Sequence, residues 1–174
     1  MKKYVLTYKT PAEDSDIGWE KYSLPLGNGY FGASVFGRTD LERIQFATNV
    51  FANVKKQGGV SNFAEIRVDF GHKDVQDYER GLDISGGFAY TQYNFGENRW
   101  ESRSFLSYPD KVFVYRVESS QKADFSVRLV IPYLHARSPE EGGGARGCFP
   151  SMKTVLLCAE HCRAESFCTK ANLP

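Results

Sequence analysis

The sequence has no cysteine before Cys148, and its four cysteines, Cys148, Cys158, Cys162 and Cys168, all fall near the C-terminus. A disulfide framework would usually hold together the core of a domain and not only its last stretch, so these cysteines do not predict one. No apolar run is long enough to span a bilayer, and the N-terminus has two lysines but no apolar signal segment. We therefore expect no membrane partner and a cytoplasmic location.

An excess of charge of one sign is also missing. The 22 lysines and arginines nearly balance the 21 aspartates and glutamates, which leaves a formal net charge of +1. Binding to nucleic acid or to an anionic membrane draws on positive charge, so this balance removes the electrostatic case for either partner. Helical periodicity is absent too, because no segment before Pro139 repeats its apolar residues every three to four positions. A mainly helical fold is therefore not expected.

What the chain does have is a series of short apolar segments separated by turns. Aromatic residues make up 14% of the sequence, and 16 glycines are spread along it. The segment 63–70 alternates apolar and charged residues, which is typical of an antiparallel strand with one buried face. We predict strands at 2–9, 30–36, 43–48, 63–70, 78–84, 88–95, 99–106, 111–118 and 125–131. The fold class that follows is all-β, an antiparallel β-sandwich, with a loop at 10–23.

The same patterns predict the core. We expect burial of Val35, Phe36, Ile44, Ile66, Val68, Leu82, Val112, Val114, Val127 and Leu129. Within 111–118 the apolar residues follow one another almost without interruption, which favours burial on both faces of that strand. Phe113, Tyr115 and Val117 should then be covered as well. The length of 174 residues suits one domain with a core of this kind.

The densest cluster of glycine, proline and apolar residues before the tail lies at 24–37. Pro25 has no backbone N–H, so it cannot lie in a central strand, and 27–29 has the composition of a turn. The glycines of 27–32 also have the G-x-G-x-x-G spacing of a dinucleotide-binding fingerprint. That motif needs a helix after the third glycine, whereas 34–37 is poor helix sequence. We therefore favour a turn that leads into a strand.

Four segments occur in the order that is typical of one enzyme family. They are LPLGNGYFGA at 24–33 preceded by Trp19, ERIQ at 42–45, YERGLDI at 78–84 and RSFLSYPDKV at 103–112. In this order they resemble the N-terminal region of glycoside hydrolase family 95, the α-L-fucosidase-like enzymes. The resemblance implies that the chain is the N-terminal β-sandwich domain of such an enzyme, forming part of a larger sandwich.

The resemblance also implies what the chain does not carry. In that family the general acid and the residues that activate water lie in a helical (α/α) barrel beyond this sequence, so we expect no catalytic residue here. We expect no metal and no cofactor either. The missing barrel would be the partner of the sandwich, and the full-length enzyme would bind carbohydrate. After 42–45 the family continues with an acidic pair that 46–52 lacks, which leaves the contact to the barrel and the sugar specificity open.

Glycosidases usually work with two carboxylates that flank the bond to be cleaved. Candidate acids lie on strand faces or in turns, where we expect them to be solvated, and they are Glu65, Asp69, Asp77, Glu79, Asp83, Glu97 and Glu101. Two arginines of the family segments, Arg80 and Arg103, are expected to pair with Glu79, Asp83 or Glu101. These residue types alone identify no ligand-binding residue.

Aromatic and histidine side chains give a second set of candidates. Four aromatic residues of one predicted hairpin have two alternative roles, stacking on a sugar or packing in the core and across strands, and they are Tyr90, Tyr93, Phe95 and Trp100. His72 and His135 follow predicted strands and have no serine or cysteine partner in a recognisable motif. We interpret both as surface histidines.

The tail differs in composition from the rest of the chain. Residues 137–147 have the composition of a linker, and 153–170 shows no strand alternation. We predict one partial sandwich domain at 1–136 and a disordered or irregular tail at 137–174, which is foreign or the product of a shifted reading frame. The alternative for the tail is a small zinc site made of Cys158, His161, Cys162 and Cys168, although their spacing is cramped and irregular.

Two hypotheses of different classes remain for the whole chain. The first is the N-terminal sandwich of a glycoside hydrolase that hydrolyses fucosyl or related bonds, a fragment that is inactive without its barrel. The second is a stand-alone carbohydrate-binding or structural β-domain. The four ordered segments favour the first.

Overall fold

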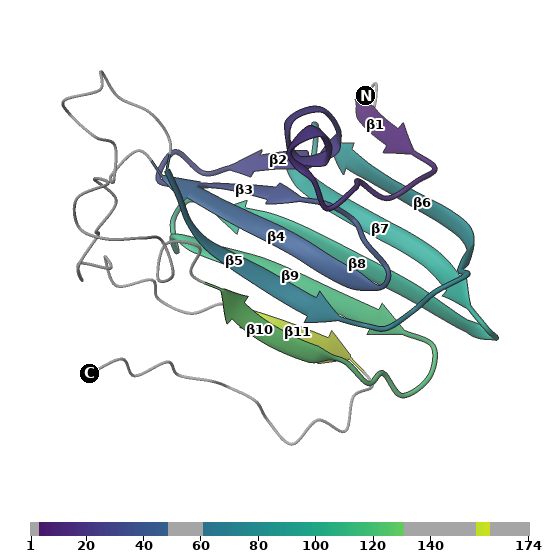
Figure 1. The fold of residues 1–174 in the computed structure, drawn as a ribbon. Coiled ribbons are helices and arrows are strands. Elements are labelled where there is room, and N and C mark those ends of the chain that lie inside the picture. The colour runs from purple at the N-terminus through teal and green to yellow at the C-terminus, as the bar shows by residue number, and fades with distance from the viewer. Residues whose placement is uncertain (1–3, 49–60, 131–155, 161–174) are drawn as a thin grey trace, which may run out of the picture.

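The fold is an all-β sandwich, as the sequence predicts. The structure, a computed structural model, describes residues 4–48, 61–130 and 156–160 of the 174-residue chain. Two sheets pack face to face, and the described part of the chain contains eleven strands and one helical turn, η1 (Gly18–Tyr22) (Figure 1). The turn falls within the loop expected at 10–23. No helix among the described residues is long and apolar enough to cross a membrane.

The first sheet has five antiparallel strands. In spatial order they are β10 (Ser126–Val130), β5 (Ser61–Asp69), β4 (Leu41–Thr48), β3 (Gly32–Val35) and β2 (Leu24–Gly27). Pro25 lies in β2, at the edge of the sheet, where its missing N–H breaks no central ladder. The prediction that it avoids a central strand is confirmed.

The second sheet has six strands. In spatial order they are β1 (Val5–Tyr8), β6 (Gln76–Asp83), β7 (Phe88–Phe95), β8 (Asn98–Ser107), β9 (Val112–Ser119) and β11 (Leu156–Glu160). All neighbours pair antiparallel except β11, which runs parallel to β9. This strand comes from the tail, where the sequence pattern predicted none. The other tail residues lie outside the described part of the chain.

The core lies between the two sheets and follows the predicted alternation. Six of the ten expected core residues are buried, namely Val35, Phe36, Ile44, Ile66, Val68 and Leu82. In β9 the inward side chains are Phe113, Tyr115 and Val117, all at most 2% exposed, whereas Val112 and Val114 point outward and are half-buried. Burial on both faces of β9 was therefore wrong, because the side chains on its outer face are only partly covered.

The other two misplaced core residues are in β10. Val127 and Leu129 pair with Val68 and Ile66 and so belong to the inward face of the sheet, yet they are 43% and 53% exposed. The strand is at the edge of its sheet, and no described strand of the second sheet contacts it substantially. A side chain on the inward face of an edge strand is therefore not buried when no strand of the other sheet packs against it.

Candidate functional site

Two of the four family-like segments meet at one end of the sandwich. The turn between β2 and β3 is held by Asn28, whose Oδ1 accepts the backbone N–H groups of Tyr30 and Phe31 at 3.0 and 3.1 Å. Asn28 Nδ2 donates to the carbonyl of Ser107, at the end of β8, over 2.8 Å. Asn28 is buried, so these three hydrogen bonds join the two turns firmly. The turn is predictable from the local sequence, whereas this bridge is not.

The joined turns present two tyrosines and a lysine to solvent. Tyr30 and Tyr108 are 42% and 64% exposed, and their ring centroids are 5.6 Å apart at a tilt of 35°. Lys111 Nζ lies 4.4 Å from the centroid of the Tyr30 ring, a cation–π distance. We call Tyr30, Tyr108 and Lys111 the tyrosine platform. Apolar ring faces next to hydroxyl and ammonium donors suit a ligand that has both an apolar face and hydroxyl groups, as a sugar has.

The backbone of both turns depends on left-handed conformations. Gly29 has a φ of +83°, which glycine adopts without steric cost. Lys111 has a φ of +56°, which is uncommon for a residue with a Cβ. Ser107 Oγ donates to the Asp110 carboxylate at 2.6 Å and helps to hold this second turn. The tyrosine platform therefore rests on two internally braced turns.

At the opposite end of β3 lies a buried carboxyl group that sequence analysis missed. Glu42 is fully buried, and its Oε1 accepts the N–H groups of Gly37 and Arg43 at 3.0 and 2.9 Å. Its Oε2 has no hydrogen-bond partner. Burial raises the pKa of Glu42 to about 8, against the pull of these backbone N–H groups. The side chain is therefore a neutral acid at pH 7, shielded from any ligand.

Arg80 is an internal anchor and not the partner of a nearby carboxylate. It is 1% exposed, its Nε donates to the Thr10 carbonyl at 2.8 Å, and its Nη1 donates to the Tyr22 carbonyl at 2.6 Å. Its guanidinium also lies over the Tyr8 ring at 4.5 Å. The expected pairing with Glu79, Asp83 or Glu101 was wrong, because this side chain faces the interior, where backbone carbonyls of the 10–22 segment are within reach.

Arg103 behaves as predicted. Its Nε donates to Glu101 at 2.6 Å on the outer face of the six-stranded sheet. The guanidinium lies 5.6 Å from the centroid of the Phe88 ring. Because the arginine is more than half exposed, this pair adds little to stability.

The carboxylate candidates are dispersed, and two of them are not solvated. Glu65 is 4% exposed, and it pairs with Arg43 at 2.7 Å and with Arg67 at 3.0 Å. Burial alone would raise its pKa, but the hydrogen bond and charge of Arg43 outweigh it, so the pKa of Glu65 is lowered. Asp83 is also buried and accepts the N–H of Gly86 at 2.9 Å. For these two, the expectation of a solvated carboxylate was wrong.

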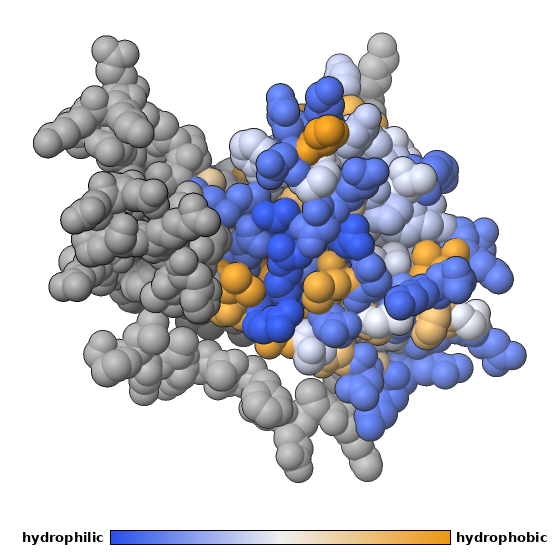
Figure 2. All heavy atoms as spheres, viewed as in Figure 1, coloured by the Kyte–Doolittle hydropathy of each residue, from blue (hydrophilic) through white to orange (hydrophobic). Residues whose placement is uncertain are grey.

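Asp14 extends the ion pairs of Glu65 into a network. It contacts Arg43 at 2.8 Å and Arg67 at 2.5 Å, and so ties the N-terminal segment to the outer face of the five-stranded sheet. Figure 2 shows this face as largely hydrophilic with scattered apolar patches. The charges here neutralise one another and do not converge on a hollow. We interpret the network as structural.

The remaining acids also have local partners or face solvent. Glu79 accepts from Lys9, Tyr90 and Gln92, and Asp77 accepts from Asn94. Asp69 and Glu97 are exposed. None of these contacts places two acids on either side of a site for a glycosidic bond.

The aromatic candidates divide between core and surface. Tyr93 and Trp100 are 5% and 4% exposed and pair across β7 and β8, which confirms the core alternative for both. Tyr90 is half-buried and bonds to Glu79, whereas Phe95 is 39% exposed. His72 is buried, with its Nδ1 2.9 Å from the Tyr93 hydroxyl, so its interpretation as a surface histidine was wrong. His135 lies outside the described residues.

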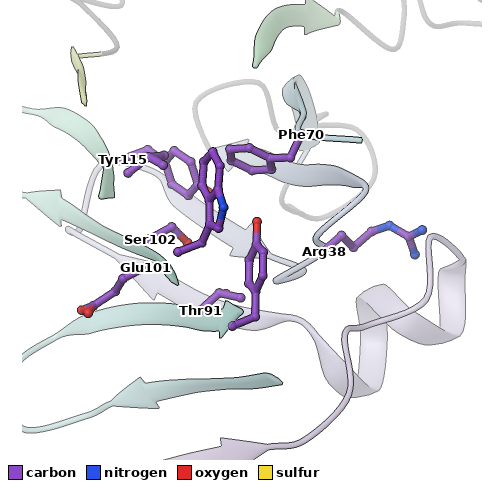
Figure 3. A pocket seen from close by; sticks show the side chains of 9 residues that line it. Arg38, Phe70, Thr91, Glu101, Ser102 and Tyr115 are labelled. Carbon is purple, nitrogen blue, oxygen red and sulfur yellow. The ribbon is translucent and has the colours of Figure 1, made fainter. Parts of the chain in front are cut away.

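A small cavity lies between the two sheets. It has a volume of about 10 Å³, near the minimum that a single water needs, with Phe70, Thr91, Ser102 and Tyr115 in its wall. The charged groups of Arg38 and Glu101 point away from it (Figure 3). This cavity is therefore too small to hold a sugar.

The sequence suggests a metal site only in the tail. Cys158, His161, Cys162 and Cys168 have no described side chains, so the zinc alternative stays outside what the structure addresses. Elsewhere, the residues that the structure describes contain no group of three or more His, Cys, Asp or Glu side chains that could hold a metal ion.

Comparison with known proteins identifies the chain as a glycoside hydrolase N-terminal domain. The family model for the glycosyl hydrolase family 65 N-terminal domain matches residues 6–51 and 47–147. A curated relative, the "Probable alpha-fucosidase A" of Aspergillus niger, is 34% identical over 64 residues, which is 36% of this chain and 8% of the relative. The match thus spans less than a tenth of the relative's length. The motifs resemble family 95, whereas the matching model is that of family 65, and both are glycoside hydrolases. The chain belongs to the glycosyl hydrolase family 65 N-terminal domain family.

Proposed function

We propose that this chain is the N-terminal sandwich module of an α-fucosidase-type glycoside hydrolase resembling family 95. The four ordered segments support the proposal, and so does the similarity to a probable α-fucosidase. In this proposal the catalytic acid and the water-activating group belong to a helical barrel outside this sequence. The described carboxylates support that division, because Glu65, Asp83 and Glu79 are committed to structural contacts.

The observation that carries the proposal is the bridge between Asn28 and Ser107. It brings together two segments that lie 79 positions apart and that both resemble the enzyme family. It also fixes the tyrosine platform at one end of the sandwich. We infer that this end faces the glycan and the catalytic barrel, where Tyr30 and Tyr108 contact the sugar and Lys111 donates to its hydroxyl groups.

Activity measurements test the proposal at two levels. The 174-residue chain alone should not hydrolyse an aryl α-L-fucoside above the rate of a blank. The same module joined to its barrel should do so, and Tyr108→Ala in that enzyme should raise KM about tenfold with little change in kcat, as expected for lost ground-state binding. Tyr4→Ala is the matched control, because Tyr4 is 63% exposed but belongs to the N-terminal strand region. Turnover by the chain alone would contradict the proposal that the catalytic residues lie in the barrel.

The proposal includes a domain boundary at Ala136. Residues 1–136 form the module, and 137–174 derive from a foreign or shifted reading frame, although the family match runs on to residue 147. The described tail residues form the single strand β11, which pairs with β9 of the module. Because β11 is one short strand at an edge of its sheet, we expect a chain that ends at Ala136 to have a free energy of unfolding in urea within about 1 kcal/mol of that of the full chain. Stabilisation by several kcal/mol would show that the tail is part of the fold.

A stand-alone carbohydrate-binding β-domain is the second candidate. The exposed pair of Tyr30 and Tyr108 favours it, because such a platform needs no barrel in order to bind a sugar. Genomic sequence downstream of the codon for His135 distinguishes the two candidates. A reading frame that continues with strands and a helical barrel supports the hydrolase module, and a genuine stop supports the stand-alone domain.

A further inference from the structure

An open pocket lies at the end of the sandwich opposite the tyrosine platform. It has a volume of about 450 Å³ and is formed where the β7–β8 turn meets the segment after β9. Its wall includes Phe95, Glu97, Trp100, Gln121 and Asp124. Figure 1 shows the tip of the β7–β8 hairpin far from the turn between β2 and β3. The pocket is therefore separate from the site proposed above.

The wall of the pocket holds a fixed aromatic surface. Phe95 is 39% exposed, and its ring stacks on the imidazole of His72 with centroids 4.2 Å apart and planes 22° apart. The Tyr93 hydroxyl lies 2.9 Å from Nδ1 of this imidazole, and the Trp100 ring packs against it in a T-shaped contact with ring centroids 4.4 Å apart. An exposed phenyl ring backed by a buried stack loses little entropy when a ligand covers it.

Polar groups surround this ring and are held by a braced turn. Asn98 Oδ1 accepts from the hydroxyls of Ser119 and Ser120 and from the backbone N–H of Gln121. Its Nδ2 donates to Ser119 Oγ at 2.8 Å. This network fixes the segment after β9 against the β7–β8 turn, so the two halves of the pocket keep their relative position.

The charges of the pocket narrow the ligand class. The residues that line the pocket include two with carboxylates, Glu97 and Asp124, one with an ammonium group, Lys122, and one with an amide, Gln121. Two carboxylates against one lysine disfavour a phosphate or another anionic ligand. An exposed aromatic ring beside carboxylate and amide groups suits a ligand that has an apolar face and many hydroxyl groups.

We propose that this pocket binds one neutral pyranose ring of a glycan, which stacks on Phe95 and donates its hydroxyls to Glu97 and Asp124. The side-chain amide of Gln121 accepts or donates one further hydrogen bond. Because the pocket lies at the opposite end from the tyrosine platform, it acts as an accessory anchor and takes no part in bond cleavage. The assignment goes beyond the proposed hydrolase role: its part as an accessory anchor rests on that role, whereas the binding of the sugar does not.

A titration of the ¹⁵N-labelled full chain followed by NMR tests the proposal. The probes are methyl α-L-fucopyranoside, methyl β-D-galactopyranoside and inorganic phosphate. The chain has two tryptophans, so two indole N–H signals report separately. A glycoside should shift the Trp100 signal saturably with a Kd of about 1–10 mM, a usual affinity for a few contacts, and the Trp19 signal should stay unchanged. Backbone amides of 95–98 and 121–124 should move together with Trp100.

Matched variants separate stacking from general surface effects. Phe95→Ala should weaken binding at least about tenfold, which corresponds to about 1.4 kcal/mol. Phe105→Ala is the control, because Phe105 is 42% exposed on the outer face of β8, and it should leave the affinity unchanged. Gln121 lies in a loop outside the β7–β8 hairpin. Gln121→Ala should therefore also weaken glycoside binding, without any effect on the folding of that hairpin.

Three outcomes would overturn the assignment. They are no shift of Trp100 with either glycoside, binding of phosphate in preference to the glycosides, or equal losses in Phe95→Ala and Phe105→Ala. A failure of the proposed hydrolase function has a different signature, the absence of turnover in the enzyme that contains the barrel. The two proposals can therefore fail independently.

Discussion

At the scale of single residues, the molecule is organised by polar groups that are buried between or beside the sheets. Glu42 is the clearest case, because its Oε1 orders the turn at Gly37 while its Oε2 has no partner. Tyr78 closes the same turn from the other sheet by donating its hydroxyl hydrogen to the Gly37 carbonyl. A buried side chain with one unpaired oxygen costs little free energy as a neutral carboxylic acid but much more as a charged carboxylate. The turn therefore depends on the protonation state of one side chain.

We predict that Glu42 makes the stability of the chain fall with rising pH. Its pKa is about 8 in the folded state, against an ordinary value of 4.5. Between these values the unfolded chain has lost the proton that the folded chain keeps, so the free energy of unfolding decreases by up to about 1.4 kcal/mol per pH unit. Urea denaturation from pH 5 to pH 8.5 measures this slope.

Glu42→Gln should remove most of that slope and leave stability near pH 5 within about 1 kcal/mol of the wild type, since the amide oxygen can still accept two N–H groups. Glu101→Gln is the control, because this acid lies on the outer face of the sheet and pairs with Arg103. An unchanged slope in Glu42→Gln would rule out Glu42 as its source.

Gly37→Ala should destabilise the chain by about 2–4 kcal/mol, a loss typical of strain combined with overpacking. The φ at Gly37 is +69°, and an added Cβ would lie 2.5 Å from Cδ of the buried Arg80. Gly96→Ala is the matched control, because its φ is +61° and nothing lies within 4 Å of the added Cβ. This control should lower the free energy of unfolding by only about 1 kcal/mol, the cost of placing a residue with a Cβ at a positive φ. Equal losses would show that the clash is absent.

At this scale the sequence was a poor guide to side-chain environment. Glu65 follows the charged face of its strand as predicted, but the N-terminal segment folds over that face and brings Asp14 to the same arginines. His72 follows β5 in a polar turn, yet distant aromatic residues of β7 and β8 enclose it. In both cases the environment comes from long-range packing, which local composition does not encode.

At the scale of elements, the strands and turns were the most predictable part. Each predicted strand has a counterpart that starts within about three residues, because alternation with a period of two and glycine-rich turns are local signals. The turn η1 and the pairing of β11 have no such signal. The tyrosine platform shows the limit, since both of its turns were found in the sequence but their contact was not.

Asn28→Ala should cost about 1–3 kcal/mol, because it leaves the partly buried Ser107 carbonyl and two backbone N–H groups without their partner. It should also separate the β2–β3 turn from the β8–β9 turn, which would be seen as increased amide exchange at Tyr30. Asn94→Ala provides the control, because Asn94 makes one exposed side-chain bond to Asp77. That substitution should change stability by less than about 0.5 kcal/mol. Similar losses in both variants would contradict the role of the bridge.

At the scale of the whole molecule, the two sheets do not cover each other completely. The fully buried Val68 and Ile66 have Val127 and Leu129 as neighbours on the same inward face, and these two are about half exposed. The edge strand β10 therefore presents apolar side chains together with a backbone edge that pairs with no other described strand. Both features promote association between chains. Such an edge is what a larger sandwich would cover.

We therefore expect the isolated chain to self-associate through β10, and the double substitution Val127→Lys and Leu129→Lys to increase its monomer fraction. Lysine on an edge strand opposes pairing with a second edge, and at these half-exposed positions its ammonium group can reach water. Ile84→Lys removes an apolar side chain of similar exposure, 58%, from a turn at the end of β6, and it should leave association unchanged. Light scattering coupled to size-exclusion chromatography measures all three proteins. If the unmodified chain is monomeric at high concentration, or if Ile84→Lys acts as strongly as the double variant, then the exposed face of β10 is not the cause of association, and the sandwich is closed at that edge in solution.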